Sequence, residues 1–260
     1  MDYYFAYHLL RLPVLRLSDS PTILLLPVIS RRITSLDPPR YFQYPHCFPV
    51  YLPQRQTLGL FHCWHRLTKR KYMLNFCVFC GSALGNNTIY QQETEKLIRY
   101  LVEKEAGIVY GGGKVGLMGL VADTALQHGG SVTGVMPVQL VEKEIAHPKL
   151  TELVVTADMH ERKAKMAELS DVFIALPGGA GTLEEIIEQW TWAQLGIHHK
   201  PCILFNVNGY YDEYITFVNK VVNEGFMKKE YLDMLIVSDS PETVLDKALS
   251  YQPPKAKWDK

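Results

Sequence analysis

The chain has 260 residues, of which 47% are hydrophobic and 21% are charged, and its formal net charge is zero. This length suits one ordinary domain with an appendage, and the hydrophobic fraction is normal for a globular core. Five cysteines without a dense spacing pattern favour a reducing, cytoplasmic compartment over a disulfide framework, and no apolar run approaches the roughly 20 residues that span a bilayer.

Residues 1–72 differ in composition from the rest of the chain. They hold 8 of the 15 prolines, 10 of the 27 Lys and Arg, and 3 of the 27 Asp and Glu, which leaves 17 basic against 24 acidic residues, a net charge of −7, after residue 72. No helical or strand period is sustained there. A targeting peptide or a basic binding arm stays open, but we expect a disordered extension, or sequence upstream of a native start at Met73. The acidic remainder argues against a nucleic-acid partner.

Short apolar runs alternate with helical segments over residues 73–252. Runs rich in Val, Ile and Phe predict strands at 75–82, 107–113, 131–137, 150–157, 171–179, 201–207 and 234–239. Helical segments are predicted at 88–105, 117–129, 158–170, after 177–182, at 210–225 and at 241–250. This alternation is typical of a parallel sheet with helices on both faces. We therefore predict a doubly wound, Rossmann-like α/β domain over 73–252, followed by a tail over 253–260.

Two glycine clusters each lie between a predicted strand and a predicted helix, YGGGKVGLMG at 110–119 and PGGAGT at 177–182. Loops that follow parallel strands meet at one edge of the sheet, where ligands bind and helix N-termini present unpaired N–H groups. Glycine lets the main chain approach a ligand without a Cβ in the way. Neither cluster has the GK[ST] or GxGxxG pattern, and each alone could be a structural turn, but the two together predict a phosphate site.

The helix after PGGAGT has two distinct sides when it is phased at 100° per residue. One side, which we expect to pack on the sheet, carries Leu183, Ile186, Ile187, Trp190 and Ala193. The opposite side carries Glu185, Glu188 and Trp192. Glu185 could complete a capping box with Thr182 as N-cap, or it could be catalytic. Trp192 lies on the side away from the sheet, so its large apolar ring must be buried by something other than the sheet. We favour a subunit interface.

Arg162 is predicted on the apolar side of the helix at 158–170. Because that helix runs antiparallel to the strands, its first turn lies at the same edge as PGGAGT. A buried guanidinium needs an anionic partner, and its fork of donors favours a carboxylate or a phosphate. The alternative is an arginine whose head reaches solvent.

Cys77 and Cys80 have the CxxC spacing of redox and zinc motifs. They lie in a predicted buried strand, with neither a helix start nor a second ligand pair. We interpret them as structural.

The segments MHERK and PGGAGTLEE resemble those of the Lonely Guy family of cytokinin riboside 5'-monophosphate phosphoribohydrolases, whose hallmark PGGxGTxxE is intact here from Pro177 to Glu185. The match extends through CVFCGS, YGGGKVGLMG, TWAQLGIHHKP and NVNGYYD, whereas residues 1–72 have no counterpart. The resemblance implies hydrolysis of the N-glycosidic bond of an adenine-type nucleoside 5'-monophosphate to free base and ribose 5-phosphate. It also implies a homodimer or larger assembly.

The resemblance implies roles for individual residues. It places the catalytic pair on Arg162 and Glu185. It places the substrate contacts on Glu144, Lys163, Gly179, Ala180, Gly181, Thr182, Leu183, Glu184 and Thr191. From the two glycine clusters we add Gly112, Gly113 and Gly178 to the predicted substrate-binding residues. We expect neither a metal nor a cofactor there.

A glutamate at a helix N-terminus beside an arginine should have a lowered pKa, because both neighbours favour the anion. We therefore expect Glu185 to be an ionised base or an electrostatic stabiliser rather than an acid. Arg162 would orient that carboxylate or the sugar phosphate.

Three other functions are compatible with parts of this pattern. A broader nucleosidase would act on AMP, and a carrier would bind a nucleotide or cofactor without turnover. Members of this family are often labelled lysine decarboxylases, but Lys200 enters a predicted strand at the edge opposite the glycine loops. A Schiff-base lysine there would lie far from any phosphate.

Overall fold

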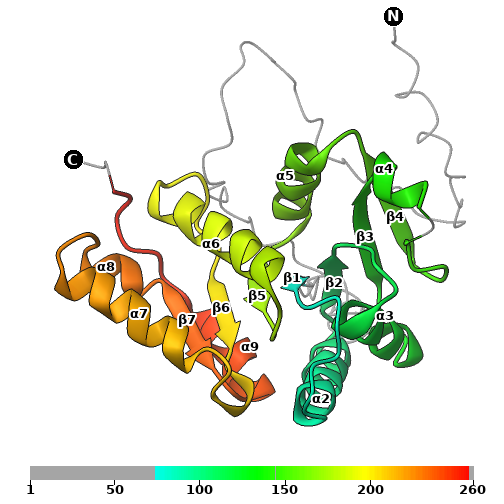
Figure 1. Ribbon diagram of the computed structural model, residues 1–260, viewed down its shortest axis with the longest axis horizontal. Coiled ribbons are helices and arrows are strands. Elements are labelled where there is room, and N and C mark those ends of the chain that lie inside the picture. The colour runs from blue at the N-terminus through cyan, green and yellow to red at the C-terminus, as the bar shows by residue number, and fades with distance from the viewer. Residues whose placement is uncertain (1–73, 144, 258–260) are drawn as a thin grey trace, which may run out of the picture. The chain divides into compact units, whose positions relative to one another are not determined.

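The computed structural model describes residues 74–143 and 145–257 (Figure 1). The predictions for residues 1–72 and for Glu144 lie outside these residues. Seven strands form one parallel sheet in the order β4-β3-β2-β1-β5-β6-β7. The strands are β1 (Asn75–Phe79), β2 (Gly107–Tyr110), β3 (Val132–Pro137), β4 (Glu152–Thr156), β5 (Val172–Ala175), β6 (Cys202–Phe205) and β7 (Leu235–Ser238). All seven predicted strands are confirmed.

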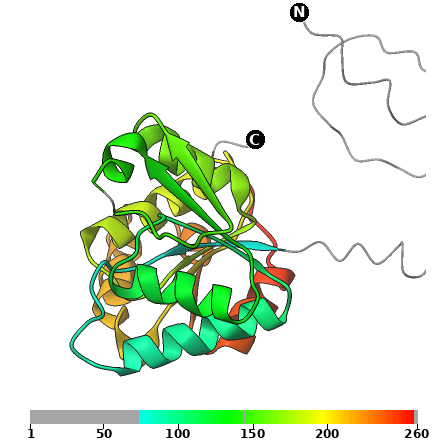
Figure 2. The same ribbon diagram turned by 90° about the vertical axis from the view of Figure 1, so that its right-hand side faces the viewer.

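Helices cover both faces of the sheet. The longer ones are α2 (Ile89–Glu103), α3 (Gly116–Gln127), α5 (Met159–Leu169), α6 (Ala180–Gln194), α7 (Asp212–Asn223) and α9 (Pro241–Ser250). Side chains of α2, α3 and α9 share one core cluster with Phe76 and Val78, and α2 and α3 lie side by side on that face (Figure 2). Side chains of α5, α6 and α7 share the other cluster with Cys77 and Phe79. The predicted fold class is therefore confirmed.

The side chains of Cys77 and Cys80, which have the CxxC spacing, point to opposite faces of the sheet. Cys77 packs into one core cluster and Cys80 into the other, because successive side chains of a strand point to opposite faces. Both thiols are free and buried, and burial raises the pKa of each. They are structural, as predicted.

Three short elements were not predicted: α4 (Val138–Val141), the 3₁₀ turn η1 (Val207–Gly209) and α8 (Lys229–Leu232). Elements of three or four residues are too short to show a helical period. Among the described residues we find no helix with the length and hydropathy needed to cross a bilayer.

The strand order reverses between β1 and β5. From β1 the chain builds outward through β2, β3 and β4, and then returns to the other side of β1 to add β5, β6 and β7. Loops that follow β1 and β5 therefore diverge to opposite faces and leave a crevice between the carboxyl ends of these strands. Ligands of open α/β sheets bind at such a point.

Candidate active site

The glycine loop after β5 leads into α6 three residues earlier than predicted. Gly179 is the N-cap, and α6 begins at Ala180. Thr182 therefore lies inside the helix, buried, with its side chain in the space that a Cβ on Gly178 would need. Of the two alternatives for Glu185, the capping box with Thr182 as N-cap is therefore excluded, because the short turn and its glycines let the helix start before the threonine.

The first turn of α6 leaves main-chain donors unpaired. The amides of Ala180, Gly181 and Thr182 have no carbonyl one turn earlier in the helix to bond. A Cβ on Gly179 or Gly181 would meet no atom within 4 Å. Packing within the chain thus explains why residue 178 must be glycine, but it does not explain the glycines at 179 and 181. At these two positions a ligand can reach the main chain.

Arg162 is buried at the start of α5, with 8% of its surface exposed. Its Nε donates to the carbonyl oxygen of Val135 at 3.0 Å, and its Nη1 donates to Oε1 of Glu185 at 2.9 Å. Gly111, which follows β2, leaves the space that the guanidinium occupies. The expected anionic partner of Arg162 is therefore a carboxylate of α6.

The electrostatic prediction for Glu185 is wrong. Burial raises its pKa above the ordinary value of 4.5, and the Arg162 guanidinium, which lowers the pKa, does not cancel this shift. The prediction assumed a position at the N-terminus of α6. Glu185 instead lies in the second turn, where the helix dipole is weak and the removal of solvent dominates.

Lys163 bridges two further carboxylates of α6. Its Nζ lies 2.6 Å from Oε1 of Glu184 and 2.9 Å from Oε1 of Glu188, and these hydrogen bonds raise the pKa of the lysine. The other oxygen of Glu188 is buried and has no partner among the described residues. Sequence reasoning assigned Glu188 only to a helix side, because a contact between α5 and α6 leaves no local pattern.

The phase predicted for α6 is confirmed in part. Ile186, Trp190 and Ala193 are buried as predicted, and Leu183 packs partly against the same core. Ile187 is 36% exposed, contrary to prediction. Trp192 packs partly against the core of its own chain, so its burial does not depend on a partner subunit alone. Thr191 is exposed and donates to the carbonyl of Ile187 at 2.7 Å.

The first glycine cluster is tied to the segment that follows α4. The carbonyl of Gly112 accepts from the amide of His147 at 2.9 Å, and Gly113 forms an isolated antiparallel bridge with Ala146. Gly112 has a φ of +80°, which disfavours other residues. Gly112 and Gly113 thus border the site on the side of β3 rather than at the crevice.

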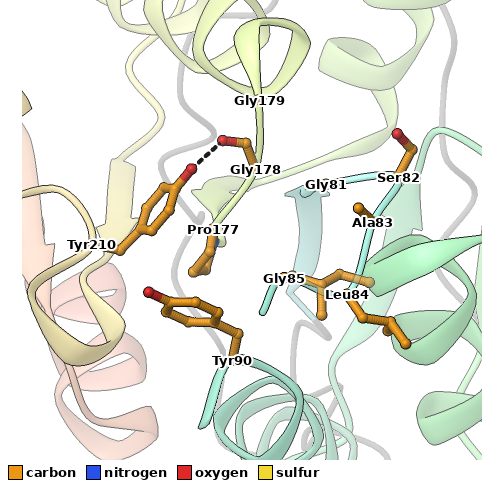
Figure 3. A pocket seen from close by; sticks show the side chains of 11 residues that line it. Gly81, Ser82, Ala83, Leu84, Gly85, Tyr90, Pro177, Gly178, Gly179 and Tyr210 are labelled. Carbon is orange, nitrogen blue, oxygen red and sulfur yellow. Dashed lines mark hydrogen bonds between the residues drawn. The ribbon is translucent and has the colours of Figure 1, made fainter. Parts of the chain in front are cut away.

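A cavity of about 300 Å³ occupies the crevice between β1 and β5 (Figure 3). Its walls are the loop at 81–85 after β1, the turn at 177–179 after β5, and the rings of Tyr90 and Tyr210. Sequence reasoning gave no ligand role to 81–85, Tyr90 or Tyr210. The position of the first loop beside the reversal of strand order, which only the topology reveals, could have indicated it.

Lys200 lies at the opposite edge of the sheet, before the amino end of β6. Its ammonium donates to the carbonyl of Ala167, near the end of α5, at 2.6 Å. It is neither in the cavity nor beside Arg162. A lysine at this edge cannot serve chemistry at the glycine loops.

The chain matches a family model described as possible lysine decarboxylase over residues 118–248. Curated relatives carry another name. Cytokinin riboside 5'-monophosphate phosphoribohydrolase LOG5 of Arabidopsis thaliana is 44% identical over 189 residues, which cover 70% of this chain and 83% of the relative. The probable cytokinin riboside 5'-monophosphate phosphoribohydrolase LOGL3 of Oryza sativa subsp. japonica is 47% identical over 177 residues, covering 68% of this chain and 84% of the relative.

Solved structures of lower identity share the fold. A molybdenum cofactor binding protein of Rippkaea orientalis is 21% identical with a TM-score of 0.52, covering 70% of this chain and 98% of the other. The molybdenum cofactor carrier protein of Chlamydomonas reinhardtii is 17% identical with a TM-score of 0.52, covering 69% and 99%. These two likenesses bear on the fold alone. Because the plant relatives are far more similar and match most of their own length, the chain belongs to the Lonely Guy family of cytokinin riboside 5'-monophosphate phosphoribohydrolases.

Proposed function

We propose that this chain hydrolyses the N-glycosidic bond of a cytokinin riboside 5'-monophosphate, an N6-modified AMP, to the free base and ribose 5-phosphate. The observation that carries the proposal is the ion pair of Arg162 and Glu185, held at the same edge of the sheet as the open first turn of α6. The names of the curated relatives specify the substrate class.

The substrate phosphate binds at the first turn of α6 in this proposal. Unpaired amides and the positive end of the helix dipole favour an anion there. The bare main chain at Gly179 and Gly181 allows phosphate oxygens to approach closely. Lys163 adds a cation from the neighbouring helix α5, and its two carboxylate partners on α6 hold it in place.

Glu185 and Arg162 act on the sugar and on water. Cleavage passes through an oxocarbenium-like state, which a nearby carboxylate stabilises. Water adds its hydroxyl to the anomeric carbon as the N-glycosidic bond breaks, and its proton passes to Glu185. The departing base takes up a proton from solvent at the nitrogen that leaves the sugar, and Glu185 returns its own proton to solvent before the next turnover. The raised pKa of Glu185 makes its ionised form a stronger base. Arg162 keeps that carboxylate oriented.

Product analysis of the full chain tests the proposal. Free base and ribose 5-phosphate are measured after incubation with AMP, with N6-isopentenyl AMP and with adenosine. We expect release from the prenylated nucleotide. Equal release from AMP would favour the broader nucleosidase, and binding without release from any nucleotide would favour a carrier.

We further propose a homodimer or larger assembly in the cytoplasm. Apolar residues near the end of α6 support the assembly, because Leu195 is 40% exposed and Ile197 is 62% exposed, and exposed apolar patches mark interfaces. Light scattering on the purified protein would show a mass above 29.7 kDa; a monomer would exclude the assembly. The substrate roles of Glu144, Thr191, Gly112 and Gly113 stay predictions.

A further inference from the structure

Two adjacent tyrosines that follow β6 bond the glycine loop from outside. The hydroxyl of Tyr210 donates to the carbonyl oxygen of Gly178 at 2.5 Å (Figure 3). The hydroxyl of Tyr211 donates to the carbonyl oxygen of Leu176 at 2.6 Å. The carbonyls on either side of Pro177 are therefore both held by phenols from one loop.

The loop that carries the tyrosines is itself fixed. Asn208 and Gly209 have positive φ angles of 51° and 70°. The side chain of Asn206 accepts from the amide of Tyr211 at 2.7 Å and donates to Asp212 at 2.8 Å. This tight turn sends the two rings in different directions.

The two tyrosines differ in what surrounds them. Tyr211 is 2% exposed and belongs to the core, whereas Tyr210 is 39% exposed and forms a wall of the cavity. Its ring meets that of Tyr90 edge-on, with centroids 5.7 Å apart. Packing in the core therefore explains why residue 211 is a tyrosine, but it does not explain why residue 210 carries a hydroxyl group.

The bond from Tyr210 fixes the direction of the amide of Gly179, the N-cap of α6, which lies beside the unpaired amides of the first turn. A peptide unit is planar and trans, so its C=O and its N–H point in opposite directions. The carbonyl of Gly178 and the amide of Gly179 belong to one such unit. Because neither residue has a side chain to restrict rotation, the phenol supplies the restraint that turns the Gly179 amide away from Tyr210.

We propose that Tyr210 is a positioning residue that sets the affinity of the glycine loop for the substrate phosphate. This inference rests on the proposed function, and it assigns to residues 206–212 a part in phosphate recognition. Tyr210 acts through Gly178 and Gly179 and does not itself touch the reacting atoms.

The test compares Tyr210→Phe with Tyr100→Phe. Both remove one phenol oxygen, but Tyr100 lies on α2 outside the cavity, and its hydroxyl has no hydrogen bond among the described residues. For each protein we would measure KM and kcat with the nucleotide, the inhibition constant of inorganic phosphate, and kcat/KM with the unphosphorylated nucleoside. Melting temperatures would show that both variants fold.

For Tyr210→Phe we expect KM and the phosphate inhibition constant to rise together by about 2- to 12-fold, the range that one neutral hydrogen bond supplies. We expect kcat, and kcat/KM with the nucleoside, to stay unchanged. Tyr100→Phe should match the wild type in all four. The inference is overturned if the two variants have the same phosphate inhibition constant, or if Tyr210→Phe lowers nucleoside and nucleotide turnover equally.

Binding measurements separate this inference from the proposed function. If the wild-type chain binds AMP without cleaving it, the proposed function fails, yet calorimetry with AMP and with phosphate still compares the two variants. Weaker binding by Tyr210→Phe alone would support the positioning role. Equal binding by both variants would refute it.

Discussion

Arg162 and Glu185, which are 23 positions apart, meet at 2.9 Å between the first part of α5 and the second turn of α6. Both side chains are largely withdrawn from solvent, with 10% and 14% of their surfaces exposed. Burial of one charge without the other would be costly. Because β5 links the two helices directly, a short stretch of chain creates this pair.

Loss of either partner should abolish base release. We expect Arg162→Ala and Glu185→Ala to lower kcat by at least about 10²-fold, since in the proposed mechanism each removes a group that acts in the transition state. Free base would be quantified by chromatography, and circular dichroism would check folding. Glu168→Gln, which changes an exposed carboxylate of α5, is the control and should retain full activity. Substantial turnover in either alanine variant would refute the assignment.

The raised pKa of Glu185 predicts a pH-dependent contribution to stability. A carboxyl whose folded-state pKa lies above its unfolded value contributes stability that is complete below about 4.5 and is lost as pH rises through the folded pKa. Glu185→Gln removes this titration. The free energy of unfolding of the wild type, measured against that of the variant, should therefore fall as pH increases from 4 to 7. A rise over the same interval would show that Arg162 outweighs burial.

His198 should make the protein less stable in mild acid. Burial, followed by the charge of Lys200, lowers the pKa of His198 from 6.5 to about 4. Between these two pKa values the unfolded chain binds a proton at His198 but the folded chain does not. The stability that the neutral histidine contributes is therefore complete above pH 6.5 and is lost as pH falls towards 4. Denaturant midpoints between pH 7 and pH 5 should fall less steeply in His198→Gln. The adjacent, exposed His199 supplies the control, and an equal effect of His199→Gln would contradict the prediction.

Alanine substitutions should separate the two kinds of glycine in the loop. A Cβ on Gly178 would collide with Thr182, whereas a Cβ on Gly181 would meet nothing within 4 Å. We expect Gly178→Ala to lower the melting temperature. Gly181→Ala should keep or raise stability, by up to about 1 kcal/mol, while it weakens phosphate binding because a methyl group obstructs the anion. Thermal melts with KM values check both, and an unchanged KM in Gly181→Ala would argue against close approach of a ligand there.

Much of the fold was predictable because its signals are local. Each strand is a short apolar run, and the helices between them show their own period. Arg162 was predictable for a related reason, since a charge on an apolar helix side demands a partner. The start of α6 was mispredicted because Thr182 has the residue type of an N-cap, whereas the earlier glycines, which decide the boundary, carry no side-chain signal.

Contacts between distant segments account for what the sequence did not reveal. The bond from Tyr210 to Gly178 joins residues 32 positions apart, and the crevice depends on β5 lying beside β1. The pKa of Glu185 depends on solvent removed by neighbouring elements, which no motif encodes. The boundaries at residues 72 and 252 stay predictions.

Because α5, β5 and α6 follow one another directly in the chain, the residues of the proposed chemistry lie in one continuous segment. The guanidinium, the carboxylates and the open helix turn all lie within residues 159–194, whereas the far walls of the crevice belong to other parts of the chain. If the proposed roles of Arg162 and Glu185 hold, a chimera that exchanges residues 159–194 between two relatives should carry both partners of the ion pair with it and should inherit the rate of bond cleavage of the protein that donates this segment.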